Sequence, residues 1–94
     1  MTKAEIKAIL EQIEDKKADC LRHYRAYSNL LDMDSVSVND TVVQNRKQHI
    51  IRAFNKHEAL CELAEKMGIK VKSNVVAELP RMAASELLHI VWDN

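Results

Sequence analysis

The chain has 94 residues, which is short for one domain, and a chain of this length buries only about 60 to 65% of the surface that its unfolded form exposes. It contains one glycine and one proline, a composition that favours a few long helices and argues against an all-β fold. Lysine plus arginine and aspartate plus glutamate both number 14, so no overall field directs the chain to nucleic acid, an acidic substrate or an anionic membrane.

Two capping-box patterns mark the starts of two long helices. In both, a threonine precedes an acid or amide by three positions, at Thr2 and at Thr41, and this pair of side chains satisfies free N–H groups of a first helical turn. We predict a first helix at about 3–31 and a second at about 41–67, with Gly68 as a left-handed cap.

The last quarter of the chain is predicted to hold a third, shorter helix. Segment 69–79 alternates apolar and polar residues in part, which suits an extended connection or a short helix equally well. Pro80 can occupy a first helical turn, so we place the third helix at about 80–92. The predicted fold is all-α: an antiparallel, coiled-coil-like helical hairpin plus a shorter C-terminal third helix, in a single domain over 1–94.

Both long helices carry an apolar stripe at alternating spacings of four and three, which is typical of a seam between helices. In the first helix the stripe consists of Ile6, Leu10, Ile13, Lys17, Cys20, Tyr24, Tyr27 and Leu31. In the second helix it consists of Val43, Lys47, Ile50, Phe54, His57, Cys61 and Ala64. If Leu31 faces Val43, the numbers of facing residues sum to 74 and the stripes match throughout. Lys17 then faces His57 in a polar layer that would fix the register.

The third helix is apolar around most of its circumference. Its polar residues recur every four positions, and we expect it to dock at the end of the hairpin where other apolar side chains gather. Those side chains are Ile9, Ala53, Leu60, Leu63 and Met67. One hairpin cannot easily cover so wide a surface, so the remainder is predicted to be a partner or dimer interface. Its expected anchors are Leu87, Leu88, Val91 and Trp92. The alternative is that this helix tucks into a groove within the monomer.

A second predicted surface is a locally basic flank of the hairpin. The sum-of-74 register places the basic stretch of the first helix beside that of the second. The expected anion or nucleic-acid contacts are Arg22, Arg25, Arg46, Lys47, Arg52 and Lys56. Such a flank can hold phosphates or meet an acidic protein surface, and the ordinary alternative is a solvated charged face.

The sequence offers no constellation that predicts an enzyme. We find no nucleophile with a base, no phosphate-binding glycine loop and no convergent pair of carboxylates, so we expect no catalysis, cofactor or small-molecule substrate. His57, Cys61 and Cys20 fall near one another in the register, yet a fourth metal ligand is missing and we expect no metal. Both cysteines are read as free thiols that pack as small hydrophobes.

These observations predict a small cytoplasmic interaction module: a regulator, adaptor or inhibitor with a protein partner, which self-associates as a homodimer through its C-terminal helix. The alternative is a nucleic-acid-binding regulator that uses the basic flank. A charged first turn and the lack of a long apolar run predict a cytoplasmic protein without a membrane association.

Overall fold

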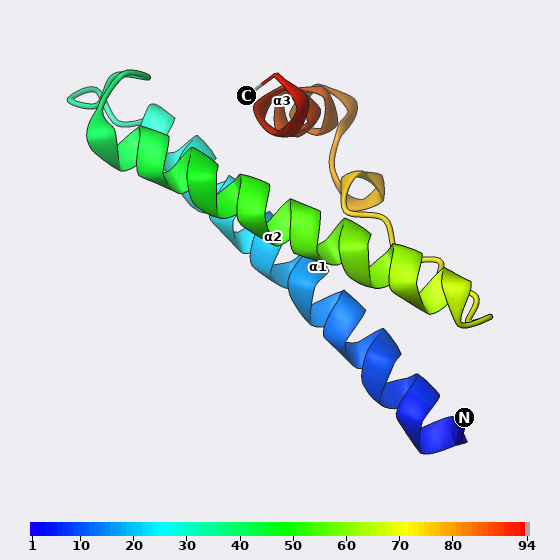
Figure 1. The fold of residues 1–94 in the computed structure, drawn as a ribbon. Helices are drawn as coiled ribbons and strands as arrows, with labels where there is room; N and C mark the ends of the chain where they lie inside the picture. The colour runs from blue at the N-terminus through cyan, green and yellow to red at the C-terminus, as the bar shows by residue number, and fades with distance from the viewer. Residues whose placement is uncertain (94) are drawn as a thin grey trace.

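The computed structural model describes residues 1–93 and confirms the predicted all-α fold. Two long antiparallel helices, α1 (Lys3–Leu31) and α2 (Thr41–Lys66), form a hairpin, and a single turn of 3-10 helix, η1 (Val76–Glu78), precedes the shorter helix α3 (Arg81–Trp92) (Figure 1). No strand occurs within the described residues. The helices begin and end within one residue of the predicted positions.

Local chemistry accounts for the ends of α1 and α2. At the start of α1 the capping box is present, with the hydroxyl of Thr2 accepting from the backbone N–H of Glu5 at 3.1 Å. The second predicted capping box is wrong. Asp40 is the N-cap of α2, and its carboxylate accepts from the backbone N–H of Ser37 in the preceding loop, while Gln44 donates to the carbonyl of Val38. The side chains of Asp40 and Gln44 thus hydrogen-bond to backbone groups of the loop before α2 and do not cap the N–H groups of its first turn.

Gly68 ends α2 as predicted. Its φ of +81° lies in the left-handed region, which favours glycine because other residues place a Cβ too close to the following carbonyl. The backbone N–H of Gly68 bonds to Glu65 and that of Ile69 to Ala64, the two bonds of a Schellman motif. Ile69 is buried beside Ala64 and Ile13, so this cap turns the chain back toward the hairpin.

The seam between α1 and α2 contains the residues expected from the stripes. Its fully or nearly fully buried members are Ile13, Cys20, Tyr24, Tyr27, Val43, Ile50, Phe54, His57 and Ala64. The ammonium of Lys47 lies 5.9 Å from the ring centre of Tyr27, its partner in the predicted register. The Cys20 thiol lies 3.8 Å from the carbonyl oxygen of Ile50, which points along α2 toward Phe54.

The predicted polar layer has different partners from those expected. Lys17 bonds to Glu14 at 2.8 Å and to Glu78 at 3.0 Å. His57 is buried, with Nδ1 donating to Glu58 and Nε2 lying 2.8 Å from the hydroxyl of Ser73. Lys17 and His57 therefore both anchor the segment that connects α2 to α3.

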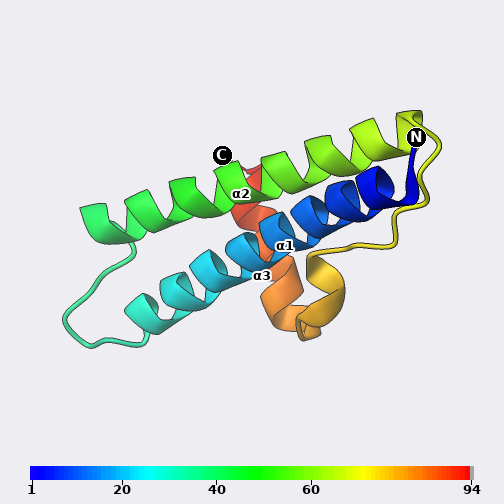
Figure 2. The ribbon, with the colours of Figure 1, turned by 90° about the horizontal axis from the view of Figure 1, so that it is seen from below.

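The predicted docking place of α3 is wrong. Residues 69–80 run back from Gly68 along the hairpin, and α3 crosses α1 and α2 near their middle (Figure 2). Leu87 and Ile90 belong to the same buried cluster as Leu21, Tyr24 and Phe54. The seven residues 69–75 can span up to about 23 Å when extended, so they carry α3 away from the C-terminal end of α2. Leu63 and Met67, at that end of α2, remain 55% and 45% exposed.

The molecule is elongated, measuring 51 × 23 × 20 Å. Toward its N-terminus, α1 diverges from α2, so the hairpin is open at that end (Figure 1). The total surface is 6485 Å², whereas a monomeric protein of this mass exposes about 5,500 Å². The fold therefore exposes roughly 900 Å² more than a compact monomer.

Candidate functional site

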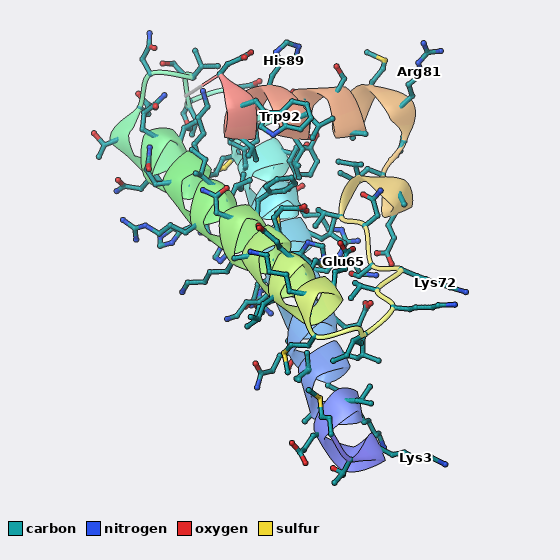
Figure 3. The ribbon with its side chains drawn as sticks, turned by 45° about the vertical axis from the view of Figure 1, so that its right-hand side comes forward. Lys3, Glu65, Lys72, Arg81, His89 and Trp92 are labelled. Carbon is teal, nitrogen blue, oxygen red and sulfur yellow. The ribbon has the colours of Figure 1, made fainter. Side chains whose placement is uncertain are left out.

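Two surfaces stand out, and the first is the outer face of α3, formed by Met82, Ser85, Leu88, His89 and Trp92. Met82 is 87% exposed and Trp92 68% exposed. Figure 3 shows Arg81 and His89 pointing away from the hairpin and Trp92 on the same helix. Four of these residues, with Asp93, line a shallow groove of about 270 Å³. An exposed tryptophan beside such a groove is typical of an interaction surface.

The predicted interface residues of α3 fall on two sides of the helix. Leu87 is 0% exposed in the hairpin core, so its expected contact with a partner is wrong. Leu88 and Val91 are half-buried against the same core, and Trp92 is the predicted anchor that the fold leaves free. Met82 was not predicted, although its spacing of ten residues from Trp92 puts both on one helical face.

The charges at the two ends of α3 are placed against the helix dipole. Arg81 is the first residue of α3 and Asp93 is its C-cap, whereas a helix favours anions at its N-terminus and cations at its C-terminus. Asp93 pairs with His89 one turn earlier at 2.5 Å, and Arg81 makes no ion pair within residues 1–93. Pairing with charges outside the helix would compensate both ends.

The second surface is a basic groove between α1 and α2. It is lined by Lys16, Asp19, His23, His49, Arg52, Ala53 and Lys56 and encloses about 210 Å³. His23 is two residues from Leu21 on α1, and Lys56 is two residues from Phe54 on α2, which is about 200° around each helix. Because Leu21 and Phe54 belong to the cluster that α3 covers, the groove lies on the opposite side of the hairpin from α3.

His23 and His49 form the centre of the basic groove. Their rings stack with centres 5.1 Å apart and an interplanar angle of 15°. Arg46 Nη1 lies 2.9 Å from His23 Nδ1, and because a guanidinium only donates, this nitrogen accepts and is unprotonated. Burial first, and then the charge of Arg46, lower the pKa of His23 below its ordinary value. The imidazole is therefore held neutral beside the guanidinium groups of Arg46 and Arg22.

The structure assembles only part of the predicted basic flank. Arg52 and Lys56 line the groove and Arg46 contacts His23 at its edge. Arg22 pairs with Asp19, and Lys47 lies over Tyr27 in the seam. Arg25 is exposed and does not line the groove.

The predicted contacts do not include Lys16 and His23, although both belong to the basic stretch of the first helix, and they do not include His49. A signal was present, because Lys16, Asp19 and His23 recur at spacings of three and four, as do His49, Arg52 and Lys56. Such spacing places each set along one helical stripe beside the seam.

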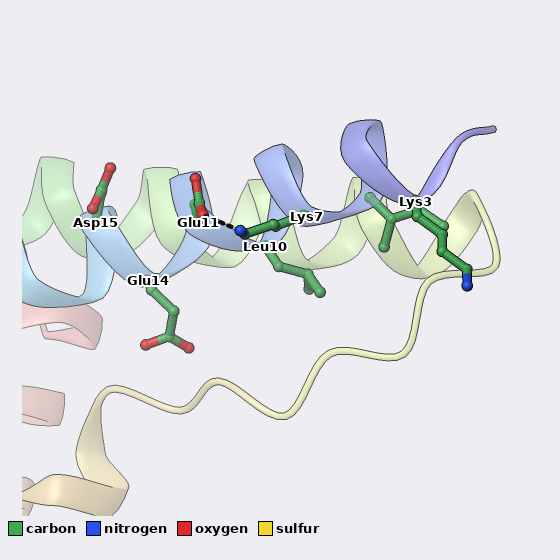
Figure 4. A pocket seen from close by; sticks show the side chains of 7 residues that line it. Lys3, Lys7, Leu10, Glu11, Glu14 and Asp15 are labelled. Carbon is green, nitrogen blue, oxygen red and sulfur yellow. Dashed lines mark ion pairs between the residues drawn. The ribbon is translucent and has the colours of Figure 1, made fainter.

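A third hollow lies over the N-terminal part of α1, where the hairpin opens. It has a volume of about 470 Å³, and the apolar residues of its lining are Ile6 and Leu10. Figure 4 shows charged side chains around it, including the Lys7–Glu11 pair at 4.0 Å. The charged residues of the lining are all exposed, so the hollow has no buried polar group that would orient a ligand.

The thiols are poor nucleophiles in this fold. Burial raises the pKa of Cys20 to about 12 and also raises that of Cys61, and the thiolate is the reactive form. Both are free, and Cys61 Sγ lies 3.7 Å from His57 Nε2. Within the described part of the chain, no group of three or more His, Cys, Asp or Glu side chains is arranged to hold a metal.

Comparison with known proteins gives no relative from which a role can be transferred: no family model, curated protein or solved structure matches this chain. None of the helices in residues 1–93 has the length and apolar character required to cross a membrane.

Proposed function

We propose that this chain is a small helical interaction module that self-associates through the outer face of α3. The observation that carries the proposal is the exposure of Trp92, at 68%, on a helix whose opposite side is already packed in the core. A tryptophan side chain contributes a large apolar area and is enriched among residues that dominate interface energies. The occupant that we propose is a second copy of the chain.

The area of the molecule supports a second copy. The surface in excess of a compact monomer, roughly 900 Å², is close to the approximately 800 Å² that each partner buries in a standard interface. Association would also compensate for the limited core of a 94-residue chain. The elongated hairpin thus has the surplus surface that dimerisation needs.

The residues of the outer face complement themselves when two α3 helices pack antiparallel about a two-fold axis near residue 87. Facing residue numbers then sum to about 174, so Met82 meets Trp92 of the second copy. Arg81 meets Asp93, and Ser85 meets His89. Leu88 lies next to the axis and contacts its own equivalent. This arrangement gives Arg81 and Asp93 the partners that oppose the unfavourable dipole at each end of α3.

Replacement of the anchor tests the proposal. Trp92→Ala should abolish the dimer, measured as molar mass by light scattering after size-exclusion chromatography across a concentration series. Met67→Ala is the matched control, since Met67 is also an exposed apolar residue but lies at the far end of α2. A wild-type mass that remains monomeric at all concentrations, or a Trp92→Ala dimer, would contradict the proposal.

A charge swap tests the antiparallel arrangement. Arg81→Asp alone and Asp93→Arg alone each place like charges opposite one another and should weaken the dimer about tenfold. The double variant restores opposite charges and should recover most of the affinity. A double variant that is weaker than either single variant would show that these residues do not face one another.

The proposal also includes the compartment and the biological role of the protein. Both cysteines are free thiols, which suits the reducing cytoplasm, and we propose that the protein acts there. We propose a role as a regulator, adaptor or inhibitor, because the outer face of α3 offers packing and charge complementarity in place of reactive groups.

A further inference from the structure

We infer that the basic groove between α1 and α2 binds the backbone phosphates of a nucleic acid and that binding draws a proton onto His23. The inference is independent of the proposed dimer, because the groove lies on the opposite side of the hairpin from α3.

The arrangement of cations matches a ligand with repeating negative charge. On α2, the cations Arg46, Arg52 and Lys56 span ten residues, or about 15 Å along the helix. One nucleic-acid strand presents a phosphate about every 3.4 Å of duplex axis, so several phosphates fit alongside this row. Lys16 adds a cation from the facing helix. A single isolated phosphate would use only part of the row.

Other polyanionic surfaces fit the groove less well. A membrane surface favours apolar or aromatic side chains that enter the headgroup region beside the cations. The lining of the groove contains no exposed apolar side chain, and its one apolar member, Ala53, is 7% exposed. Met82 and Trp92, at 87% and 68% the most exposed of the large apolar side chains, belong to α3. Val42, Leu63 and Met67 share the helical stripe of Lys56, but they lie near the two ends of α2, outside the lining of the groove.

One carboxylate limits the charge of the empty groove. Asp19 pairs with Arg22 and lies 3.7 Å from the ammonium of Lys16. Because it occupies the cations of α1, Asp19 competes with an incoming phosphate. Removal of its charge should therefore strengthen binding, which a purely structural role for Asp19 does not predict.

The uptake of a proton by His23 is explained by the charges around its imidazole. His23 faces Asp19 and Arg22 on α1 and Arg46 and His49 on α2. Asp19 raises the pKa of His23, whereas burial and the other three groups lower it. A bound phosphate adds negative charge and raises this pKa, and the proton enters at Nδ1 when Arg46, which donates to that nitrogen in the empty groove, turns to the phosphate. Binding therefore takes up a proton, and affinity increases as the pH falls below the pKa of His23 in the complex and levels off below its pKa in the empty groove.

The test is fluorescence anisotropy with a labelled oligothymidine and a labelled duplex of about 20 nucleotides, at about 50 mM salt. The double variant Arg52→Ala/Lys56→Ala should lower the slope of log affinity against log salt by about 2. Asp19→Asn should raise affinity about fivefold. Arg25→Ala is the matched control, since Arg25 is an exposed cation of α1 outside the groove, and it should change affinity less than about twofold.

The proton is tested with the same probes. Wild-type affinity should rise about fivefold between pH 7.5 and pH 5.5, and His23→Gln should remove most of that rise. Circular dichroism checks that each variant is folded, and Asp19→Asn retains a readable gain if His23→Gln fails to fold.

If neither the oligothymidine nor the duplex binds at low salt, the inference is overturned. It is also overturned by an Arg25→Ala loss equal to that of the double variant, or by pyrophosphate-induced NMR shifts in the groove without oligonucleotide binding.

Discussion

The two halves of the hairpin contain the same kind of seam and differ in what covers it. In the loop half, which extends from Cys20 to Phe54 through the turn, α3 closes the seam and eleven buried residues form one cluster. In the open half, only the connecting segment covers the seam, and the buried cluster consists of Ile13, Ala64 and Ile69. Matched apolar stripes align two helices, but a third element is needed to exclude water from them.

The largest effect is expected from removing a side chain of α3 that seals the loop half. Leu87→Ala should reduce the free energy of unfolding by about 2 to 5 kcal/mol, because Leu87 is fully buried and the alanine leaves a cavity. Leu63→Ala, at an exposed position of the open half, is the control and should change it by less than about 0.5 kcal/mol. Urea denaturation followed by circular dichroism measures both, and equal losses would refute the distinction between the halves.

The two free thiols report on the two halves separately. Cys20 is in the buried cluster of the loop half, whereas Cys61 is half-buried in the open half. Alkylation should modify Cys61 at least about tenfold faster, because Cys20 has to wait for local opening and its pKa is raised to about 12. Peptide mass spectrometry over time gives the two rates, and Leu87→Ala should bring them closer together. Faster modification of Cys20 would mean that α3 does not seal this half.

A smaller effect is expected where the chain turns from α2 into the segment that covers the open half. Gly68→Ala should reduce stability by about 1 to 2 kcal/mol because of the left-handed backbone. An added Cβ meets no other atom within 4 Å, so backbone strain is the whole effect. Gly68→Asn should lose less, since asparagine tolerates this conformation. Thermal denaturation compares the variants, and an unchanged melting temperature for Gly68→Ala would contradict the left-handed cap.

The smallest effect concerns the ion pairs that hold the connecting segment. Glu78→Gln removes one of the two carboxylates around Lys17 and should reduce stability by no more than about 1 kcal/mol, less at high salt. The hydrogen bond with Lys17 lowers the pKa of Glu14, and that with Glu14 raises the pKa of Lys17. The stabilisation by the Glu14–Lys17 ion pair is therefore present from about pH 5 to pH 10. It is lost when Glu14 is protonated in acid and when Lys17 is deprotonated in strong base. Urea titrations at several pH values measure it; a loss that grows with salt would exclude an ionic origin.

The sequence by itself determined the elements and the seam. Thr2, Gly68 and Pro80 act on their immediate neighbours, so the ends of the helices follow from local chemistry. The stripes of the two long helices repeat often enough to identify the buried seam positions before any contact is known. The repeating signal is also why the burial of Ile13, Ile50 and Phe54 could be predicted.

Only the tertiary structure decided where α3 docks and which charges gather. The path of residues 69–80 is held by Ser73 and Glu78, whose partners lie far away in sequence, so no local pattern indicates that α3 would return to Leu21 instead of Leu63. The same packing buries Leu87, exposes Trp92 and leaves His23 and His49 together on the uncovered side. Which side chains remain on the surface depends on which helix faces are buried by tertiary packing. The identity of an apolar or basic residue and of its sequence neighbours does not determine this.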